Sequence, residues 1–338
     1  MRVLVTGGTG FVGAHTVKAV LDAGHQVVLL VRDPARIEAN LGPLGVGIDR
    51  VEHVVGDMTD ASAVARAIDG CDAVIHAAAV VSLDKSRAEE ILAANVTGAA
   101  TVIDAAVERR LDPIVYVSSA SALFTPGVDL LHADLPPADV DNAYGRSKAA
   151  AEAHVRAHQA AGAPVAITYP GGVAGPPAGS AAGEIADAFA TLLDMGWVPG
   201  ADGAWSVVDV RDVADVHVAL LVRGQGPRRF ICGGHFMTLG EVAALLAELT
   251  GRRFPVLPVP GAALRGLARL LDVVRGVVPF ETVFTEEAME LLTRWAPTDD
   301  DPVATELGIM WRPVEDTFAA AIDGLVAANR ISKRRAGR

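Results

Sequence analysis

The sequence predicts a doubly wound α/β fold, in which a parallel sheet is covered by helices on both faces and a smaller, mostly helical lobe follows. Short aliphatic runs alternate with helical patterns through the first half of the chain. These runs are apolar nearly throughout, as expected for strands that are buried on both faces. A glycine-rich loop joins the first run to the first helix, where such folds hold a phosphate group.

The elements of the first half follow from the spacing of their apolar residues. Continuous aliphatic runs predict strands at residues 2–6, 26–31, 50–55, 73–76, 114–118 and 165–169. Between them, apolar residues recur every three or four positions, which predicts helices at residues 11–23, 61–68, 87–109 and 144–161. Right-handed crossovers between such strands give a doubly wound sheet.

The pattern changes after Pro170, where glycine and proline cluster in residues 171–183. Short apolar runs such as 230–232 and 256–259 then separate helical patterns. The helices are expected at residues 181–195, 213–222, 239–250, 262–275, 285–295 and 314–329. We predict three parts: a dinucleotide-binding domain at 1–176, a substrate lobe at 177–330 that shares its core and returns some strands to the sheet, and a basic tail at 331–338 that frays in solvent.

Composition narrows the class of protein. Of the 338 residues, 51% are hydrophobic and 21% are charged, which is typical of a globular chain. A formal net charge of -12 disfavours nucleic acid as a partner. Cys71 and Cys232 are far apart, so we expect two buried thiols in a cytoplasmic protein without a targeting segment. Charged residues interrupt the apolar stretch 262–278, so we expect no membrane span there.

The loop after the first strand reads Thr6-Gly7-Gly8-Thr9-Gly10-Phe11-Val12-Gly13. A phosphate group needs backbone N–H groups at close range, and glycine removes the Cβ that would block its approach. The helix N-terminus adds unpaired donors and a partial positive charge. The alternative is a tight turn with a purely structural role. We expect the pyrophosphate of a dinucleotide to contact Gly7, Thr9, Gly10, Phe11, Val12 and Gly13.

The spacing Gly-x-x-Gly-x-x-Gly resembles that of the short-chain dehydrogenase/reductase superfamily. It is most similar to the extended branch, the NAD-dependent epimerase/dehydratase family, which includes sugar-nucleotide epimerases and dihydroflavonol-reductase-like enzymes. The resemblance implies a Rossmann fold, a bound nicotinamide dinucleotide and oxidoreductase activity. It covers nearly the whole chain, most strongly residues 1–176.

The end of the second strand distinguishes the two nicotinamide cofactors. A carboxylate there accepts hydrogen bonds from the ribose of NAD, whereas an arginine pairs with the 2′-phosphate of NADP. Arg32 stands where NAD-using epimerases carry an aspartate, and Arg36 offers a second cation. We therefore expect NADP(H) in preference to NAD(H). If Asp33 faced the ribose and Arg32 turned outward, NAD would become a possible cofactor.

Three more segments carry residues that the resemblance assigns to the dinucleotide. Asp57 and Met58 follow the third strand, where the family contacts adenine, although Asp57 also suits a helix N-cap. Pro170 and Val173 lie in the turn that flanks the nicotinamide carboxamide. The small residues after the fourth strand would let the ribose approach, and they are Ala77, Ala78 and Ala79.

The run Tyr144-Gly145-Arg146-Ser147-Lys148 places a phenol and an ammonium on one face of a helix. A free tyrosine has a pKa of about 10, and a neighbouring cation lowers that pKa towards neutrality. The resemblance makes Tyr144 the acid–base catalyst and Lys148 the residue that tunes its pKa and holds the nicotinamide ribose. The alternative is an ordinary surface helix.

The fifth strand ends in three serines. Resemblance selects Ser119 as the hydroxyl that orients the substrate oxygen, with Ser118 and Ser121 as rivals. Asn95 matches the family asparagine that distorts its helix and passes a water-mediated bond to the catalytic lysine. The alternative for Asn95 is a helical side chain that is satisfied by solvent.

The turn after the sixth strand departs from the family. Tyr169 stands where arginine is frequent, Ala174 replaces a tyrosine, and the asparagine that holds a substrate phosphate is missing. Together with the apolar stretch 255–280, this favours an uncharged, fairly hydrophobic carbonyl compound or secondary alcohol as substrate. Positions that follow strands predict a substrate pocket formed by Val81, Ser82, Ser119, Phe124 and Gly171.

Two other functions stay open at this stage. A sugar-nucleotide epimerase or dehydratase would use the same residues, and a non-catalytic dinucleotide sensor would share the fold, although the Tyr–Lys pair argues against it.

A homodimer is possible. Asp212 is expected to be a structural helix cap.

His154 and His158 are four residues apart on a predicted helix, a spacing that suits metal ligands. The third ligand and the glutamate of a zinc-protease helix are missing from this segment. We therefore expect a polar helix face and no metal.

Overall fold

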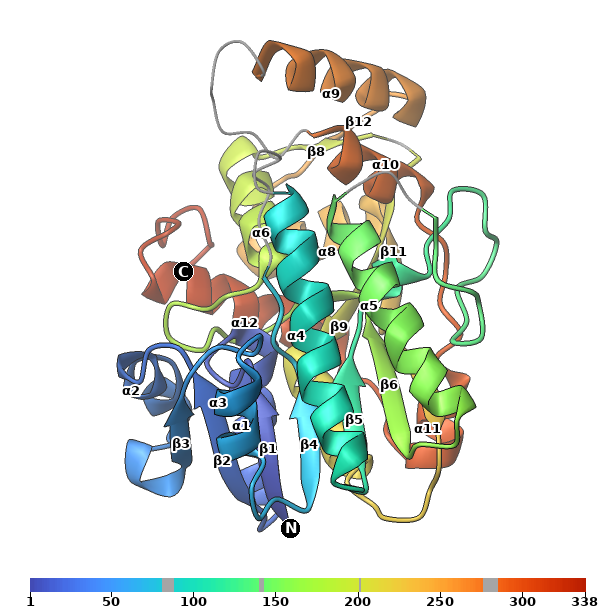
Figure 1. Cartoon of the computed structure of the whole chain (residues 1–338). Coiled ribbons are helices and arrows are strands. Elements are labelled where there is room, and N and C mark those ends of the chain that lie inside the picture. The colour runs from blue at the N-terminus through green and yellow to red at the C-terminus, as the bar shows by residue number, and fades with distance from the viewer. Residues whose placement is uncertain (81–87, 140–142, 201, 276–284) are drawn as a thin grey trace.

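The computed structural model describes residues 1–80, 88–139, 143–200, 202–275 and 285–338. Its centre is a seven-stranded parallel sheet in the order β10-β6-β5-β4-β1-β2-β3 (Figure 1). The reversal of strand order between β1 and β4 is the point at which doubly wound folds bind ligands. The strands are β1 Arg2–Thr6, β2 Gln26–Val31, β3 Glu52–Val55, β4 Ala73–His76, β5 Ile114–Val117, β6 Val165–Pro170 and β10 Arg228–Cys232.

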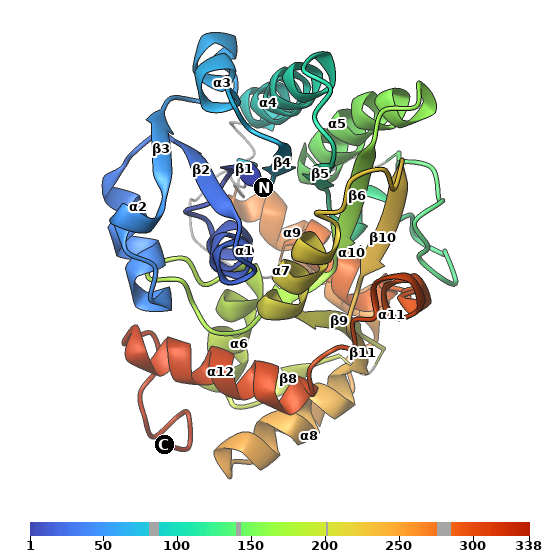
Figure 2. The same ribbon diagram turned by 90° about the horizontal axis from the view of Figure 1, so that it is seen from below.

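Helices cover both faces of this sheet, because both faces are aliphatic (Figure 2). One face is covered by α3 Ala61–Ala67, α4 Ala88–Glu108 and α5 Ala143–Ala160. The other face is covered by α1 Phe11–Asp22, α2 Ala35–Leu41, α7 Val210–Ala219 and α11 Asp301–Leu307. Cys71 and Cys232 are buried and unpaired, as expected, and burial raises the pKa of the Cys71 thiol to about 11.

The second half of the chain builds a lobe at the carboxyl ends of the strands (Figure 1). Its helices are α6 Glu184–Met195, α8 Leu239–Thr250, α9 Gly261–Arg275, α10 Glu286–Arg294 and α12 Val314–Ala327. A small sheet of β7 Gly172–Ala174, β9 Ala204–Asp209 and β11 His235–Thr238 joins them, with a second pair formed by β8 Val198–Pro199 and β12 Val256–Leu257. These elements enclose an apolar core of their own around Phe189 and Phe318.

The predicted fold class is confirmed, and β10 is a strand of the second half that returns to the sheet. The prediction missed several elements of the described chain, namely the strands β7, β8, β9 and β11 and the helices α2 and α11. The helices α2 and α11 are seven residues long, too short for the helical period to repeat clearly. Helix α7 begins at Val210, earlier than the predicted position 213, because Asp209 caps its first turn.

The last residues differ from the frayed tail that the sequence predicts. Ile331 and Ala336 are buried, and a Cβ on Gly337 would lie 2.1 Å from the carbonyl oxygen of Thr250. Arg335 and Arg338 pair with carboxylates of α6 and α12. The basic segment is held because the lobe presents acidic side chains to it.

Helix α4 is the one helix of the described chain that is long and apolar enough to cross a membrane by those two criteria alone. The stretch in question is Glu89–Glu108, of which 39% is buried. This helix packs against α5, α3 and the sheet, so its apolar residues are those of a core helix.

Candidate active site

The glycine loop between β1 and α1 has no room for a side chain at Gly7 or at Gly13, the first and last glycines of the Gly-x-x-Gly-x-x-Gly pattern. Gly7 has a φ of 74°, and a Cβ there would lie 2.6 Å from the backbone nitrogen of Ala78. A Cβ on Gly13 would lie 2.0 Å from the Gly7 carbonyl oxygen. The loop therefore lies directly against the end of β4 and the start of α1, as a dinucleotide-binding turn requires.

The start of α1 suits an anion. Its N-cap is Gly10, which offers no side chain to the first-turn amides, and the first turn contains no acidic residue. Unpaired N–H groups and the helix dipole therefore face the loop without a competing carboxylate. These features fit the pyrophosphate of a nicotinamide dinucleotide, for which Thr9, Phe11 and Val12 would supply further backbone groups.

A buried asparagine holds this loop in place. Asn40 of α2 is 1% exposed, and its Nδ2 donates to the carbonyl oxygen of Thr9 at 2.7 Å. Its Oδ1 accepts from the backbone nitrogen and hydroxyl of Ser180, at 3.3 and 3.2 Å. Asn40 thus connects the glycine loop to the segment that leads into the lobe. This role could not be predicted, because a single asparagine in a short helix forms no recognisable sequence pattern.

At the end of β2, the carboxylate of Asp33 and the guanidinium groups of Arg32 and Arg36 have different surroundings. The Asp33 carboxylate accepts from the backbone nitrogen of Ala35 at 3.0 Å, which fixes it at the start of α2. Arg32 and Arg36 are exposed, and neither guanidinium group has a hydrogen bond or ion pair in the described parts of the chain. The aspartate is therefore engaged locally, while both guanidinium groups remain available.

The segment after β3 resolves the N-cap alternative for Asp57. The N-cap of α3 is Asp60, which accepts from the backbone nitrogens of Ser62 and Ala63. Among the described residues, the Asp57 carboxylate accepts from Thr59, through the Thr59 backbone nitrogen and hydroxyl. Asp57 is half-buried, so its second carboxylate oxygen stays open to a ligand. Met58 is buried against α4, where a Cβ on Gly98 would meet it at 2.6 Å.

The small residues after β4 lie beside the glycine loop, as the family resemblance implies. Ala77 and Ala78 donate backbone hydrogen bonds to Thr6, at 3.2 and 3.4 Å, and Ala79 continues along the same edge. His76 lies behind them, 2.7 Å from the Thr6 hydroxyl. Burial and, to a lesser extent, the Lys148 charge lower the pKa of His76 to about 3, so its imidazole is neutral.

Helix α5 brings Lys148 to the carboxyl ends of the strands. Lys148 is only 7% exposed, and its Nζ donates to the carbonyl oxygen of Val117 at 3.4 Å. Tyr144 lies one turn earlier in the same helix, and its side chain is outside the described residues. Val81 and Ser82 of the predicted pocket are also outside the described residues.

The three serines after β5 have different surroundings. Ser118 is buried, and its hydroxyl donates to the Glu152 carboxylate at 2.7 Å. Ser119 and Ser121 are half-buried and share a hydroxyl–hydroxyl bond of 2.8 Å. The hydroxyl of Ser118 thus bonds within the core, whereas those of Ser119 and Ser121 lie at the half-buried strand end.

Glu152 is the centre of a buried polar cluster that the sequence analysis missed. Its side chain is fully buried and accepts from Ser118, from the Tyr169 hydroxyl at 2.8 Å and from Arg156 Nε at 2.7 Å. Arg156 also donates to the Tyr169 hydroxyl at 2.9 Å. The arginine that family members carry at position 169 is thus replaced by a tyrosine that contacts an arginine of α5. The spacing of Lys148, Glu152 and Arg156, four residues each, was the available signal.

Asn95 is buried and makes direct contacts with neighbouring backbone and side-chain groups. Its Oδ1 accepts from the backbone nitrogen of Val80 at 2.7 Å, and its Nδ2 donates to the Val80 carbonyl oxygen at 3.0 Å. The same Nδ2 donates to the Ser147 hydroxyl at 3.2 Å. Burial excludes a solvent-satisfied side chain. Asn95 therefore fixes the chain after β4 and the residue next to Lys148.

Pro170, Gly171 and Val173 lie at the carboxyl end of the sheet, where β6 ends at Pro170 and the chain passes through Gly171 into β7. Gly171 donates to the Cys232 carbonyl oxygen at 2.9 Å, and a Cβ on Gly171 would approach Gly233 to 3.3 Å. Phe124 was predicted to line the pocket, but it is 3% exposed and stacks on Trp295 with ring centroids 5.0 Å apart. Its ring therefore belongs to the core beneath the site.

The role predicted for Asp212 is wrong. Asp212 was expected to cap a helix, but the N-cap of α7 is Asp209, and Asp212 lies in the first turn. Asp212 instead accepts from the backbone nitrogen of Arg312 at 2.8 Å and pairs with its guanidinium group. Burial raises the pKa of Asp212 against the opposing effect of Arg312.

Comparisons with known proteins agree with this geometry. The family model of the NAD dependent epimerase/dehydratase family matches residues 3–233. A sterol demethylase protein B from Methylococcus capsulatus is 30% identical over 330 residues, covering 95% of this chain and 97% of that protein. A putative dihydroflavonol 4-reductase from Synechocystis is 32% identical over 268 residues, covering 76% and 74%.

The fold is similar to that of solved structures along its whole length. A UDP-glucose-4-epimerase from Stenotrophomonas maltophila, solved with bound NAD, superimposes with a TM-score of 0.78. The match covers 98% of this chain and 99% of that chain at 21% identity, which is a likeness of fold. The family match agrees with the glycine loop and the residues at the strand ends. The chain therefore belongs to the NAD-dependent epimerase/dehydratase family of extended short-chain dehydrogenases/reductases, and it is an oxidoreductase that uses a nicotinamide dinucleotide.

Proposed function

We propose that this enzyme is NADP(H)-dependent and interconverts a carbonyl group and a secondary alcohol on an uncharged, fairly hydrophobic small molecule. The observation that carries the cofactor choice is the contrast at the end of β2. Asp33 is bonded to the start of α2, whereas Arg32 and Arg36 are exposed and their guanidinium groups have no partner in the described parts of the chain. A 2′-phosphate would supply the anion that these guanidinium groups lack.

The proposed chemistry divides between cofactor and protein. The nicotinamide, when bound, supplies or accepts the hydride. Tyr144 exchanges the proton with the substrate oxygen, and Ser119 donates a hydrogen bond to that oxygen. The buried ammonium of Lys148 favours the phenolate form of Tyr144 and would hold the nicotinamide ribose. Asn95 and Glu152 position the strand ends and α5, as their buried hydrogen bonds support.

The substrate class rests on the lobe. Helix α9 lies over the carboxyl-end side of the molecule (Figure 1), and several of its apolar side chains are exposed. Leu267, Leu270 and Val273 of this helix are 51%, 60% and 65% exposed. This exposed aliphatic surface of the lobe, together with the missing phosphate-binding asparagine in the turn after β6, supports a substrate without phosphate groups.

The cofactor proposal is tested by calorimetry of NADPH and NADH binding. We expect NADPH to bind at least about 10-fold more tightly than NADH, because one charge-assisted pair at the 2′-phosphate contributes roughly that factor. Arg32→Ala should remove the difference. Arg253→Ala, which changes an exposed arginine of the lobe, is the matched control and should keep it. Equal affinities in the wild type would exclude the NADP assignment.

The chemical proposal is tested with Tyr144→Phe. We expect turnover to fall by about 10³-fold or more on a panel of hydrophobic ketones and aldehydes, because the proton donor is lost. NADPH affinity, measured in parallel, should change little. Turnover close to that of the wild type would remove Tyr144 from its role. A wild-type enzyme that retains its cofactor and shows no net redox activity on the panel would point to the epimerase alternative instead.

A further inference from the structure

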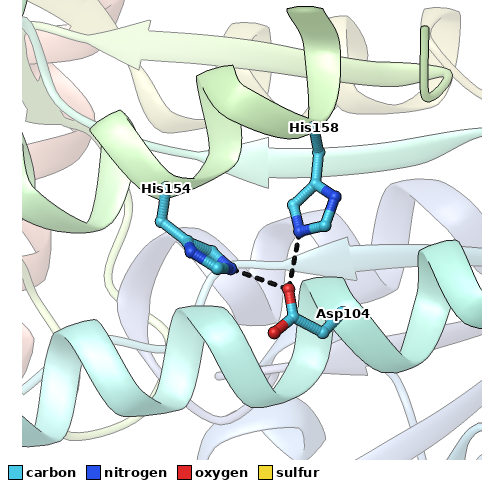
Figure 3. Close-up of side chains that lie close together, drawn as sticks. All are labelled: Asp104, His154 and His158. Carbon is cyan, nitrogen blue, oxygen red and sulfur yellow. Dashed lines mark hydrogen bonds and ion pairs between the residues drawn. The ribbon is translucent and has the colours of Figure 1, made fainter. Parts of the chain in front are cut away.

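Two helices that flank the sheet carry a cluster of ligand-type side chains away from the glycine loop. His154 and His158 project from α5, and Asp104 projects from α4 toward both of them (Figure 3). The Nε2 atoms of His154 and His158 lie 2.7 and 2.6 Å from Asp104 Oδ1. The three potential ligand atoms are all within 4.8 Å of one another.

The cluster supplies the third ligand that the sequence segment lacks. Histidines four residues apart face the same side of a helix, so His154 and His158 lie one turn apart on α5. Asp104 is 50 residues earlier in the chain and reaches them only because α4 and α5 pack side by side. The convergence of the three groups is therefore a property of the folded protein.

The surroundings leave the cluster open to an ion. The side chains of His154, His158 and Asp104 are 37%, 25% and 41% exposed, so solvent reaches the ligand atoms. In the described parts of the chain, no lysine or arginine pairs with Asp104, whose carboxylate contacts the two imidazoles. A cation there would meet one negative charge and two nitrogen ligands without competition from a basic side chain.

We propose that Asp104, His154 and His158 bind a divalent transition-metal ion, with Zn²⁺ as the best match. Two imidazole nitrogens and one carboxylate oxygen form a common ligand set for zinc, and water would fill the remaining position. Tetrahedral zinc holds its ligand atoms roughly 3.3 Å apart, so each imidazole must move by about half an ångström. Rotation of partly exposed side chains provides such a shift.

The ion would join two helices that both carry residues of the active site. Asn95 lies nine residues before Asp104 in α4, which is roughly 14 Å along the helix axis. The metal is thus too distant to touch reacting atoms, and its role is to clamp α4 to α5. We expect it to stabilise the fold and leave the chemical step unchanged.

The test is calorimetric titration of the metal-free full-length protein with ZnCl₂. We expect saturable one-to-one binding that is weakened about 100-fold or more by Asp104→Asn, a change that keeps the shape and can still hydrogen-bond the imidazoles. His154→Ala/His158→Ala should abolish it. His25→Ala is the control, because His25 and the Met1 amine, 3.1 Å apart, are another nitrogen pair that could take zinc.

Thermal unfolding provides a second readout. Zinc at about 100 times its dissociation constant should raise the melting temperature of the wild type by about 3 °C or more, and should not do so for Asp104→Asn. Binding should weaken on acidification, since zinc requires neutral imidazoles. Zinc binding that survives in Asp104→Asn and the double histidine variant, or that is lost in His25→Ala, would overturn the proposal, as would no saturable binding in the wild type.

Discussion

Ser118 and Ser119, which directly follow β5, differ in the groups that their hydroxyls contact. The Ser118 hydroxyl donates to buried Glu152, whereas the partner of the Ser119 hydroxyl among the described residues is Ser121, and Ser119 stays half-buried at the strand end. The family resemblance selects Ser119 from the sequence and leaves Ser118 and Ser121 as rivals. The difference comes from Glu152, which reaches Ser118 from α5 across 34 residues of chain.

Alanine substitutions at these two serines should therefore have opposite effects. Ser119→Ala should lower kcat about 100-fold with little change in stability, because a donor to the substrate oxygen is lost. Ser118→Ala should lower the free energy of unfolding by about 1–3 kcal/mol, since the buried Glu152 carboxylate loses a donor, while kcat changes a few-fold at most. Steady-state kinetics and urea unfolding of both variants make the comparison. The reverse pattern would assign the substrate hydroxyl to Ser118.

At the scale of the element, most strands of the first half were predictable because they are short aliphatic runs, and all but β2 are followed by a glycine, an alanine or a serine. β1, β2 and β4 begin and end at the predicted residues. The lobe was less predictable, because β9 mixes Trp205 and Ser206 with aliphatic residues and owes its place to pairing with β7 and β11. Residues of the site that act through distant partners, such as Asn40 and Glu152, have no local pattern and needed the fold.

The junction of β1 and α1 makes a prediction about Gly13. Gly13→Ala places a methyl group 2.0 Å from the Gly7 carbonyl oxygen, so the loop must shift. We expect the dinucleotide affinity to fall by about 10-fold or more and the free energy of unfolding by about 1–3 kcal/mol. Gly266→Ala is the matched control, because a Cβ in that part of α9 meets nothing within 4 Å. It should keep cofactor affinity and slightly raise stability. Unchanged affinity in Gly13→Ala would show that the cofactor does not depend on the close packing of this loop.

At the scale of the whole molecule, two buried histidines make stability depend on pH. His217 is fully buried between α1 and β6, within 2.9 Å of the Thr16 hydroxyl and 3.2 Å of the Thr168 hydroxyl. Burial lowers the pKa of His217 to about 3, as it does for His76. An unfolded histidine takes up its proton near pH 6.5, so the unfolded state binds more protons between these values. Stability should therefore fall as the pH decreases from about 6.5 towards 3.

The expected size is up to about 1 kcal/mol per pH unit for each of these histidines. Urea unfolding between pH 4 and 7 measures it. His217→Gln, which keeps a hydrogen-bonding side chain but cannot titrate, should be less dependent on pH than the wild type. His53→Gln is the control at an exposed position and should follow the wild type. Identical pH profiles for His217→Gln and the wild type would contradict the assignment of acid sensitivity to His217.

The two-sided bonding of Asn40 has a consequence for ligand affinity as well as for architecture. One amide holds Thr9 of the phosphate loop and Ser180 at the entrance to the lobe, so the two places cannot move independently. A displacement of the glycine loop is then transmitted to Ser180, and a displacement at Ser180 is transmitted to the loop. We expect a ligand that shifts one of these places to change the affinity for a ligand at the other, by the same factor in both directions.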